Sequence, residues 1–408
     1  MLPLQGACVY CVYCLPDNNG GAIVAIHFER QELARRRQVT AEQLTARSLD
    51  GLLIFRQESM YYLTGYDTFG YCFFQCLYLG ADGKITLLTR APDLRQAQHT
   101  SIIEDIRIWA DAAGKNPADD LRTILAEHGC KGRKLGIEFD AYGLTAYNWR
   151  RVETALAGFC TLEDASDLIS RLRLVKSAAE IEYVHRAAEL ADDALGAAIA
   201  LTRPGAFEGD ILAAMHSAVF QGGGDYPGNE FIIGSGNDAL LCRYFAGRRH
   251  LSDNDQLTLE FAGVYRHYHA CLMRTFIIGE PDPEHTYMHK ASIDAMSACL
   301  EALKPGHPIG RVFDAHAQVM DAAGLQAHRM NACGYSLGTT YTPTWMDWPM
   351  LYTENPVVAE PNMIFFLHMI LMNSDTNRAM TLGQTVRVTE TGCEPLSRVP
   401  LDLVIKSA

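Results

Sequence analysis

Side chains that can do acid–base or nucleophilic chemistry gather in QLTLEFAGVYRHYHACLMRTF, residues 256–276. Glu260 is the acidic group of this segment, and His267, His269 and Cys271 follow it at alternating positions. Alternate residues of a β-strand share one face, so these three side chains are expected to point the same way. Imidazole titrates near neutral pH, so His269 could carry a proton. A strand histidine held in structural hydrogen bonds is the competing interpretation.

Further candidate side chains lie outside this segment. His368 interrupts the apolar run MIFFLHMIL, where a lone histidine is usually a satisfied core residue. Arg243, in LLCRYFAGRR, could bind a carboxylate with its guanidinium fork, or could lie in a basic surface loop. Trp345 and Trp348, in TPTWMDWP, could wall a cavity or stack on a planar cation; burial in the core is the alternative.

The cysteines do not indicate a disulfide scaffold, because the 12 of them are dilute in a chain of 408 residues. Cys8, Cys11 and Cys14 form a C-x-x-C-x-x-C run, but no second pair of ligands follows at metal-binding spacing. Residues 1–26 lack the basic start of a secretory signal and are expected to form an irregular tail. Reduced thiols in a cytoplasmic protein are therefore expected.

The charge balance excludes some partners. Lys and Arg total 35 against 48 Asp and Glu, for a formal net charge of −13, so a nucleic-acid partner is not expected. No apolar run reaches the roughly 18–20 residues that cross a bilayer. The composition therefore predicts a soluble protein without a membrane partner.

The elements that must position these side chains divide into two domains. Residues 27–168 alternate strands with helices, which indicates an α/β domain with a mixed or parallel sheet. Residues 169–408 predict an α+β domain with helices packed on an antiparallel sheet. It begins with a long amphipathic helix over 170–201, in which apolar residues recur at spacings of three and four. The tail 1–26 precedes both domains.

Several segments of the second domain, in order, are similar to the pita-bread fold of methionine aminopeptidase, proline-specific peptidases and creatinase. These segments are LVKSAAEIEYVHRAA (174–188), the 256–276 hairpin, GYSLG (334–338), EPNMIFFLHM (360–369) and TVRVTETGCEPLS (385–397). The N-terminal domain resembles the extra domain of the creatinase and proline-peptidase branch. The resemblance implies an α/β creatinase-like domain followed by a pita-bread catalytic domain, and a homodimer.

The resemblance also assigns the positions that hold two metal ions in the peptidases of this fold. Glu260, Cys271, Tyr335, His368 and Gly383 fall at these positions. Two divalent cations need several carboxylates to offset their charge, and this set offers one. We therefore expect no metal and no other cofactor. A mononuclear zinc site formed by Glu260, Cys271 and His368 is the alternative.

Among the metal-free enzymes of this fold, the hairpin is most similar to the ectoine hydrolase and creatinase group. It carries E-x-A-G from Glu260 and R-x-Y-H from Arg266, and GGDYP (223–227) and MYYLTGYD (60–67) add to the resemblance. The resemblance implies that Glu260 attacks or stabilises an amidine carbon, with His269 and His368 as proton carriers. The side chains implied to bind the substrate are Arg243, Tyr335, Cys271, His267, Asp225, Tyr226, Trp345 and Trp348, with Tyr66 and Phe73 reaching a partner's active site.

Elementary electrostatics agrees with this expectation. A neutral amide is a poor electrophile, which the peptidases of this fold polarise with metal ions, whereas an amidinium or guanidinium already carries positive charge on the carbon to be attacked. A carboxylate attracts such a group and a metal ion repels it. We therefore predict a metal-independent hydrolase of a C–N bond in a small zwitterion, with Glu260 as nucleophile or general base. An Xaa-Pro peptidase with an altered metal set and an inactive pita-bread binding protein are the alternatives.

Overall fold

The computed structural model describes residues 25–243 and 247–407 and divides into two compact units, the first ending at Leu168 and the second beginning at Ile169. The sequence interpretation of Cys8, Cys11 and Cys14 therefore lies outside the described residues. Within the described ranges, no helix is long and apolar enough to cross a membrane.

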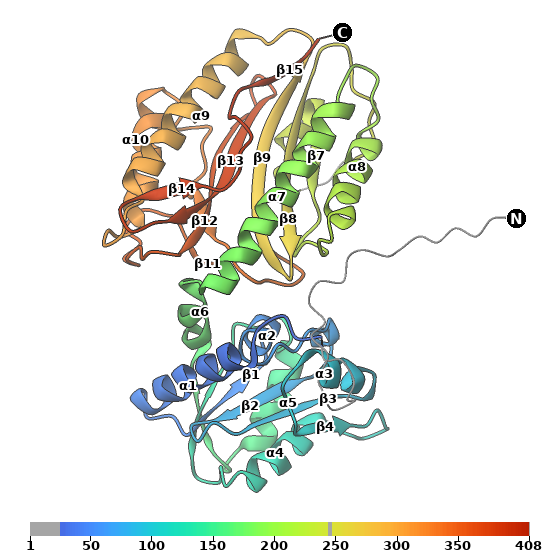
Figure 1. Ribbon diagram of the computed structural model, residues 1–408, viewed down its shortest axis with the longest axis vertical. Helices are drawn as coiled ribbons and strands as arrows, with labels where there is room; N and C mark the ends of the chain where they lie inside the picture. The colour runs from blue at the N-terminus through green and yellow to red at the C-terminus, as the bar shows by residue number, and fades with distance from the viewer. Residues whose placement is uncertain (1–24, 244–246, 408) are drawn as a thin grey trace, which may run out of the picture. The chain divides into compact units, whose positions relative to one another are not determined.

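The first unit is built on a six-stranded mixed sheet in the order β4-β3-β2-β1-β5-β6 (Figure 1). β1 pairs antiparallel with β2 and parallel with β5, so the expected α/β architecture is present. The strands are β1 Gly51–Ile54, β2 Cys76–Gly80, β3 Ile85–Arg90, β4 Ile106–Trp109, β5 Lys134–Ile137 and β6 Thr161–Asp164. The α-helices are α1 Arg30–Ala46, α2 Gln57–Thr64, α3 Leu94–Thr100, α4 Pro117–Glu127 and α5 Ala146–Leu156, with short 3₁₀ turns η1 Gly70–Cys72 and η2 Ala91–Asp93.

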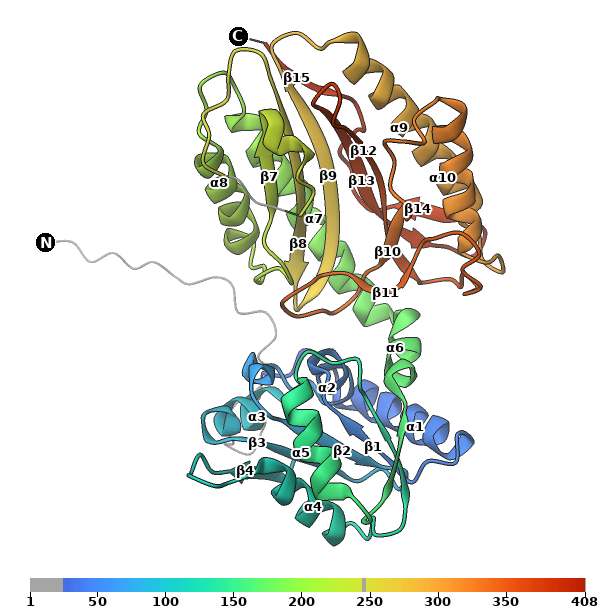
Figure 2. The same cartoon turned by 180° about the vertical axis from the view of Figure 1, so that it is seen from behind.

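The second unit is built on a nine-stranded sheet with the path β11-β10-β12-β13-β9-β8-β7 (Figure 2). Neighbours along this path are antiparallel, as expected; off it, β14 pairs with β13 and β15 runs parallel to β9. The strands are β7 Ile232–Ser235, β8 Asp255–Tyr265, β9 Tyr268–Ile278, β10 Gly334–Ser336, β11 Asp347–Met350, β12 Ile364–Asn373, β13 Arg378–Val388, β14 Cys393–Pro395 and β15 Val404–Lys406. The helices are α6 Ser166–Leu174, which starts before the boundary, α7 Ala178–Leu201, α8 Glu208–Gln221, η3 Gly236–Leu240, α9 Pro283–Ala302 and α10 Gly310–Ala322.

The prediction of one helix over 170–201 was wrong, because the chain breaks between α6 and α7. Val175 forms a β-bridge with Met363, which takes the backbone out of the helical path. Ser177 then caps α7: its side chain accepts the Glu180 N–H, and the Glu180 carboxylate accepts the Ser177 N–H. This capping box starts a new helix, which the amphipathic period alone does not reveal.

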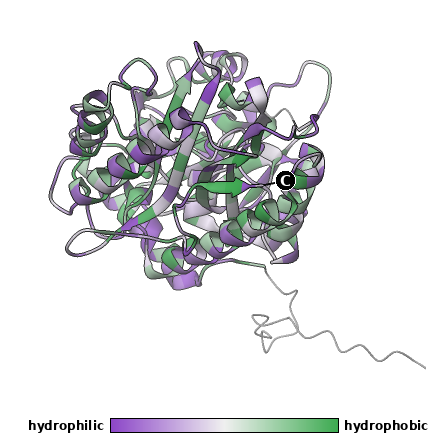
Figure 3. Cartoon of the chain, turned by 90° about the horizontal axis from the view of Figure 1, so that it is seen from above, coloured by the Kyte–Doolittle hydropathy of each residue, from purple (hydrophilic) through white to green (hydrophobic). Residues whose placement is uncertain are grey.

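The helices cover the face of the sheet opposite to Glu260. On β12 the alternate residues Phe365, Leu367 and Met369 are fully buried in the core that includes α9 and α10. On β8 a Cβ atom at Gly263 would lie 2.0 Å from the Ala187 carbonyl oxygen, so α7 packs directly on the strand there. Figure 3 shows hydrophobic residues gathered on the central strands and hydrophilic ones on the outer loops. The other face of the sheet is left for the candidate site.

The central hairpin turns at Arg266 and His267, which both have positive φ, 51° and 64°. Two consecutive left-handed residues match the right-handed twist of the flanking strands, although glycine or asparagine usually takes these positions. The carboxylate of Asp225 accepts the His267 N–H at 3.2 Å and so holds the turn.

Candidate active site

The strand register places the candidate residues in two neighbouring rows on one face of the sheet. In the first row, Glu260 pairs with Met273, Met273 with Gly383, and Gly383 with His368. The second row lies two residues away from the first on each strand, so its side chains point to the same face. It consists of Ala262, Cys271, Thr385, Phe366 and, on β10, Tyr335. Positions 260, 271, 335, 368 and 383 therefore lie on one face of the sheet.

Glu260 is held in a short chain of hydrogen bonds. The hydroxyl of Tyr335 donates to Glu260 Oε1 at 3.2 Å, and the indole N–H of Trp345 donates to the Tyr335 hydroxyl at 2.8 Å. All three side chains are buried. Trp345 is thus part of the wall of the site, and it contributes a hydrogen bond that the sequence did not predict.

Burial raises the pKa of Glu260 from 4.5 to about 7, even though the Tyr335 hydrogen bond and the charge of Arg243 both act to lower it. Taking a carboxylate out of water penalises its charged form. A carboxyl group whose pKa lies near neutral pH is available in both protonation states, which suits an acid or base catalyst.

His368 faces Tyr335, with ring centroids 5.7 Å apart, and is nearly buried. Its Nδ1 has no hydrogen-bond partner among the residues that the structure describes. Burial is the largest cause that lowers the pKa of His368 to about 3, and the positive charges of His316 and Arg243 add to it. His368 is therefore a neutral imidazole at physiological pH, with a ring nitrogen left for a ligand.

Cys271 and Gly383 complete the rows without adding charge. Burial raises the pKa of the Cys271 thiol well above its usual value, and the Glu260 carboxylate adds to this effect. Gly383 has no side chain, and the space beside it is taken: a Cβ atom there would lie 2.6 Å from Cζ of Phe366. The aromatic ring of Phe366 fills the place of a side chain at 383.

His269 is fully buried beside this group, and both of its ring nitrogens are engaged. Nε2 accepts the Gly228 N–H at 2.8 Å, which leaves the ring proton on Nδ1, 2.9 Å from the His267 carbonyl oxygen. Burial lowers the pKa of His269 to about 3. The structure therefore corrects the proton-carrier prediction and favours the competing one, a histidine held for structural reasons.

His267 and Asp225 lie at the turn of the hairpin. The His267 ring stacks on Tyr341 with centroids 4.3 Å apart, and its backbone N–H bonds to Asp225. These two residues shape the end of the site rather than its centre.

Arg243 is exposed, and its guanidinium lies 4.0 Å from the Met346 sulfur. Its positive charge lowers the pKa of both Glu260 and His368, so it lies within electrostatic reach of both. The structure therefore brings a cation to the rim of the site.

Two predicted binding residues are engaged elsewhere in the second unit. Tyr226 is 80% exposed and packs edge-on against Phe220 of α8. Trp348 is partly exposed, with the Arg171 guanidinium 5.0 Å from its ring centroid. Neither has a described contact with Glu260, so a role for them in substrate binding stays a prediction.

The prediction for the first unit also needs correction at Tyr66. Its side chain is fully buried, with the hydroxyl beside Gln75 and Thr89, so it cannot reach a partner. Phe73 is half exposed and lies under the Arg90 guanidinium.

Three residues near the site were missed by sequence reasoning. Phe366 occupies the space at Gly383, Cys242 is close enough for the Glu260 charge to raise its thiol pKa, and His316 acts on the pKa of His368. Phe366 lies two residues from His368, so strand alternation could have placed it. No sequence signal connects α10, which carries His316, to β12.

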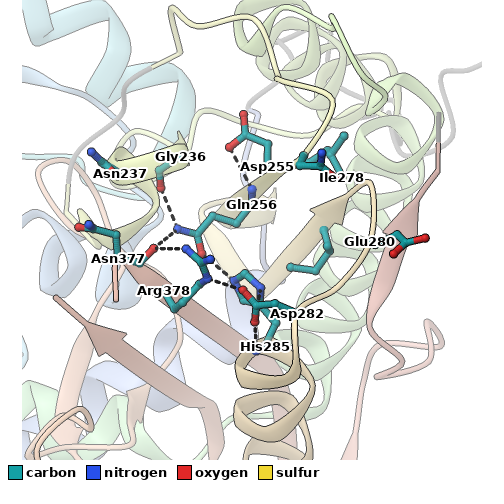
Figure 4. A pocket seen from close by; sticks show the side chains of 12 residues that line it. Gly236, Asn237, Asp255, Gln256, Ile278, Glu280, Asp282, His285, Asn377 and Arg378 are labelled. Atoms are coloured by element: carbon teal, nitrogen blue, oxygen red, sulfur yellow. Dashed lines mark hydrogen bonds and ion pairs between the residues drawn. The ribbon is translucent and has the colours of Figure 1, made fainter. Parts of the chain in front are cut away.

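A separate cavity of about 200 Å³ lies where β8 begins and β9 ends, near the start of α9 (Figure 4). Its central amide, Gln256, donates to the carbonyls of Gly236 and Asn377 and accepts from His285 and Ala379. The Asp282 carboxylate forms a salt bridge with the Arg378 guanidinium. These polar groups bond to one another, so the hydrogen bonds around the cavity hold the strand ends together.

The chain belongs to metallopeptidase family M24, a family of hydrolases. The family pattern matches residues 182–390, and the creatinase/prolidase N-terminal domain matches residues 36–175. This confirms the expected fold class, a creatinase-like domain followed by a pita-bread domain.

Curated relatives cover nearly the whole chain. Ectoine hydrolase of Halomonas elongata is 28% identical over 400 residues, which are 94% of this chain and 99% of the relative. Xaa-Pro dipeptidase of Pyrococcus furiosus is 22% identical over 88% of this chain and 96% of its own length. Among solved structures, the prolidase of Thermococcus sibiricus superposes with a TM-score of 0.82 at 19% identity, covering 91% of this chain and 98% of that one.

The family implies metal ions, but the residues at the metal positions do not fit a dinuclear centre. Glu260 is the one carboxylate among the five positions, beside a thiol, a phenol, an imidazole and a glycine, so the set offers too little negative charge for two divalent cations. The ring of Phe366 occupies the space where Gly383 would carry a ligand. Nor do the described residues contain a group of three or more His, Cys, Asp or Glu side chains arranged to hold a metal, so the mononuclear zinc alternative gains no support.

Proposed function

We propose that this protein hydrolyses a C–N bond of a small zwitterion carrying an amidinium or guanidinium group, without a metal ion. The observation that carries the proposal is that the first row has one acidic side chain and no room for a second. Glu260 is its only acid, with a pKa near neutral, and Phe366 blocks the position of a second one. Such a site attracts a cation with a single buried negative charge.

The charges of the site suit the two ends of a zwitterion. The cationic carbon–nitrogen group would lie against Glu260, where ionisation of the carboxyl is favoured by the bound positive charge. The substrate carboxylate would lie toward Arg243 at the rim, whose fork can bind it through two hydrogen bonds. The 28% identity to ectoine hydrolase supports the same class of substrate.

The reaction adds water across one C–N bond. The water oxygen bonds to the amidine or guanidine carbon, the C–N bond breaks with its electron pair going to nitrogen, and that nitrogen takes up a proton. Glu260 would activate the water or attack the carbon itself. His368 would hold the intermediate through its unpartnered nitrogen.

The test is a substrate screen with purified full-length protein. Ectoine, creatine and related zwitterions form one set and Xaa-Pro dipeptides the other, each assayed before and after chelation and with metal analysis of the protein. We expect chelator-insensitive hydrolysis in the first set and a loss of at least about 100-fold in Glu260→Gln. Hydrolysis of Xaa-Pro dipeptides that requires added metal, or full activity in Glu260→Gln, would refute the proposal. So would the absence of any turnover.

A further inference from the structure

The hydrogen-bond chain that ends at Glu260 has a fixed direction. An indole Nε1–H can only donate, so the Tyr335 hydroxyl oxygen must accept from Trp345 at 2.8 Å. Among the described residues, the single hydroxyl proton of Tyr335 then has one acceptor, Glu260 Oε1 at 3.2 Å. Without the indole N–H, the hydroxyl would lose the donor that fixes its orientation. Trp345 thus determines what Tyr335 does.

We infer that Trp345 is a positioning residue that directs the Tyr335 proton to Oε1 of Glu260 and leaves Oε2 as the oxygen that meets the substrate. This inference rests on the proposed function, in which Glu260 is the reacting acid. The inference adds to that function which oxygen of Glu260 reacts, and that Trp345 determines it.

Trp345 is itself held by the loop before β7. Its backbone N–H donates to Asn229 Oδ1 at 3.1 Å. The neighbouring Gly228 approaches so closely that a Cβ atom there would lie 2.6 Å from the Thr344 carbonyl oxygen and 2.8 Å from the Trp345 nitrogen. The Gly228 N–H is in turn accepted by His269. His269, which has no nitrogen free for a substrate, therefore anchors the loop against which Trp345 is placed.

The arrangement makes the two oxygens of Glu260 unequal. Oε1 accepts the Tyr335 hydrogen bond in both protonation states, because it is the carbonyl oxygen when the acid is neutral. The titrating proton then belongs on Oε2, and this oxygen becomes the nucleophile or base when it leaves. A hydrogen bond to the ionised form also lowers the pKa of a carboxyl group, so the chain opposes the effect of burial.

The experiment measures the pKa of Glu260 directly, from the infrared band of the protonated carboxyl group followed against pH in the full-length protein. Glu260→Gln identifies the band by removing it. The variants are Trp345→Phe, Tyr335→Phe and the double variant, with Trp348→Phe as the matched control outside the chain. We expect Tyr335→Phe to raise the pKa by about one unit and Trp345→Phe by less, with no change in Trp348→Phe.

The decisive comparison is the double variant. If Trp345 acts through the Tyr335 hydroxyl, Trp345→Phe has no further effect once Tyr335 is phenylalanine. An equal shift in both backgrounds, or no shift in either, would overturn the inference, since Trp345 would then act only by packing.

A second replacement covers the case in which Trp345→Phe does not fold. Benzothienylalanine at position 345 keeps the bicyclic shape and exchanges the N–H for sulfur, and the same shift is expected from it. Because the titration needs no turnover, its result is independent of the substrate screen. If the pKa of Glu260 shifts as expected in the variants but the protein has no hydrolase activity, the proposed function is refuted and the direction of the hydrogen bonds is established.

Discussion

Phe366 and Gly383 are cross-strand diagonal neighbours in which the ring of one fills the side-chain space of the other. The Phe366 Cζ and Cε2 atoms would lie 2.6 and 2.8 Å from a Cβ atom on Gly383, and the Met273 Cβ would lie 3.0 Å away. The Phe366 ring can therefore pack at this place because position 383 has no side chain.

This packing predicts the effect of a methyl group at position 383. Gly383→Ala should lower the free energy of unfolding by about 1–3 kcal/mol, because the buried ring cannot move without a cost. In a Phe366→Leu background, which removes the two nearest ring atoms, the same substitution should cost less. Urea denaturation of the four proteins measures the coupling, and equal costs in both backgrounds would contradict the prediction.

Glu260 should make stability fall as pH rises. Its pKa is about 7 in the folded protein and 4.5 as the ordinary value, so between these pH values the unfolded chain releases a proton that the folded chain keeps. The contribution is present below pH 4.5 and is lost toward pH 7, by about 3 kcal/mol. His269 and His368, whose pKa values are lowered to about 3, give a slope of the opposite sign in this range, so the measurement is the difference in unfolding free energy between wild type and Glu260→Gln, from urea denaturation across the range. A difference that does not change between pH 4.5 and pH 7 would contradict the prediction.

Arg243 should affect substrates through their carboxylate. Arg243→Ala is expected to raise KM for a zwitterionic substrate by about tenfold with a smaller change in kcat, because one charged hydrogen-bonding partner is lost. The same substrate as its uncharged amide should be affected little. Arg248→Ala removes an exposed charge from the same loop and serves as the control. A tenfold effect on the amide as well would exclude the carboxylate contact.

His269 should matter for stability more than for chemistry. His269→Ala leaves the buried Gly228 N–H without its acceptor and should cost about 1–3 kcal/mol in unfolding free energy. His269→Gln offers an amide oxygen in its place and should recover part of the stability and most of the activity. If both variants fold as wild type and lose activity equally, the imidazole takes part in the reaction after all.

The sequence was a good guide to the face that carries the chemistry. The resemblance to the pita-bread fold implied that Glu260, Cys271 and His368 belong to one set of positions, and strand register places them on one face, because antiparallel pairing determines which side chains meet. Local patterns also predicted the fold class, an α/β domain followed by an α+β domain.

The environment of each side chain could not be predicted in the same way. His269 and Cys271 alternate on the same strand, but the Gly228 N–H occupies a nitrogen of His269 from a loop 41 residues away in the chain. The break between α6 and α7 depends on a β-bridge from Val175 to Met363. Such long-range partners leave no local periodicity, so aromatic residues such as Tyr66 and Trp345 could not be assigned to core or site from their neighbours in the sequence.

The row of paired residues from Glu260 to His368 has a consequence for how this fold changes its chemistry. Each residue of this row lies on a different strand, and the backbone hydrogen bonds that align the strands involve no side-chain atom. Side chains in the row can therefore be exchanged without altering the scaffold. In this chain one aromatic side chain, Phe366, keeps the ladder closely packed beside Gly383.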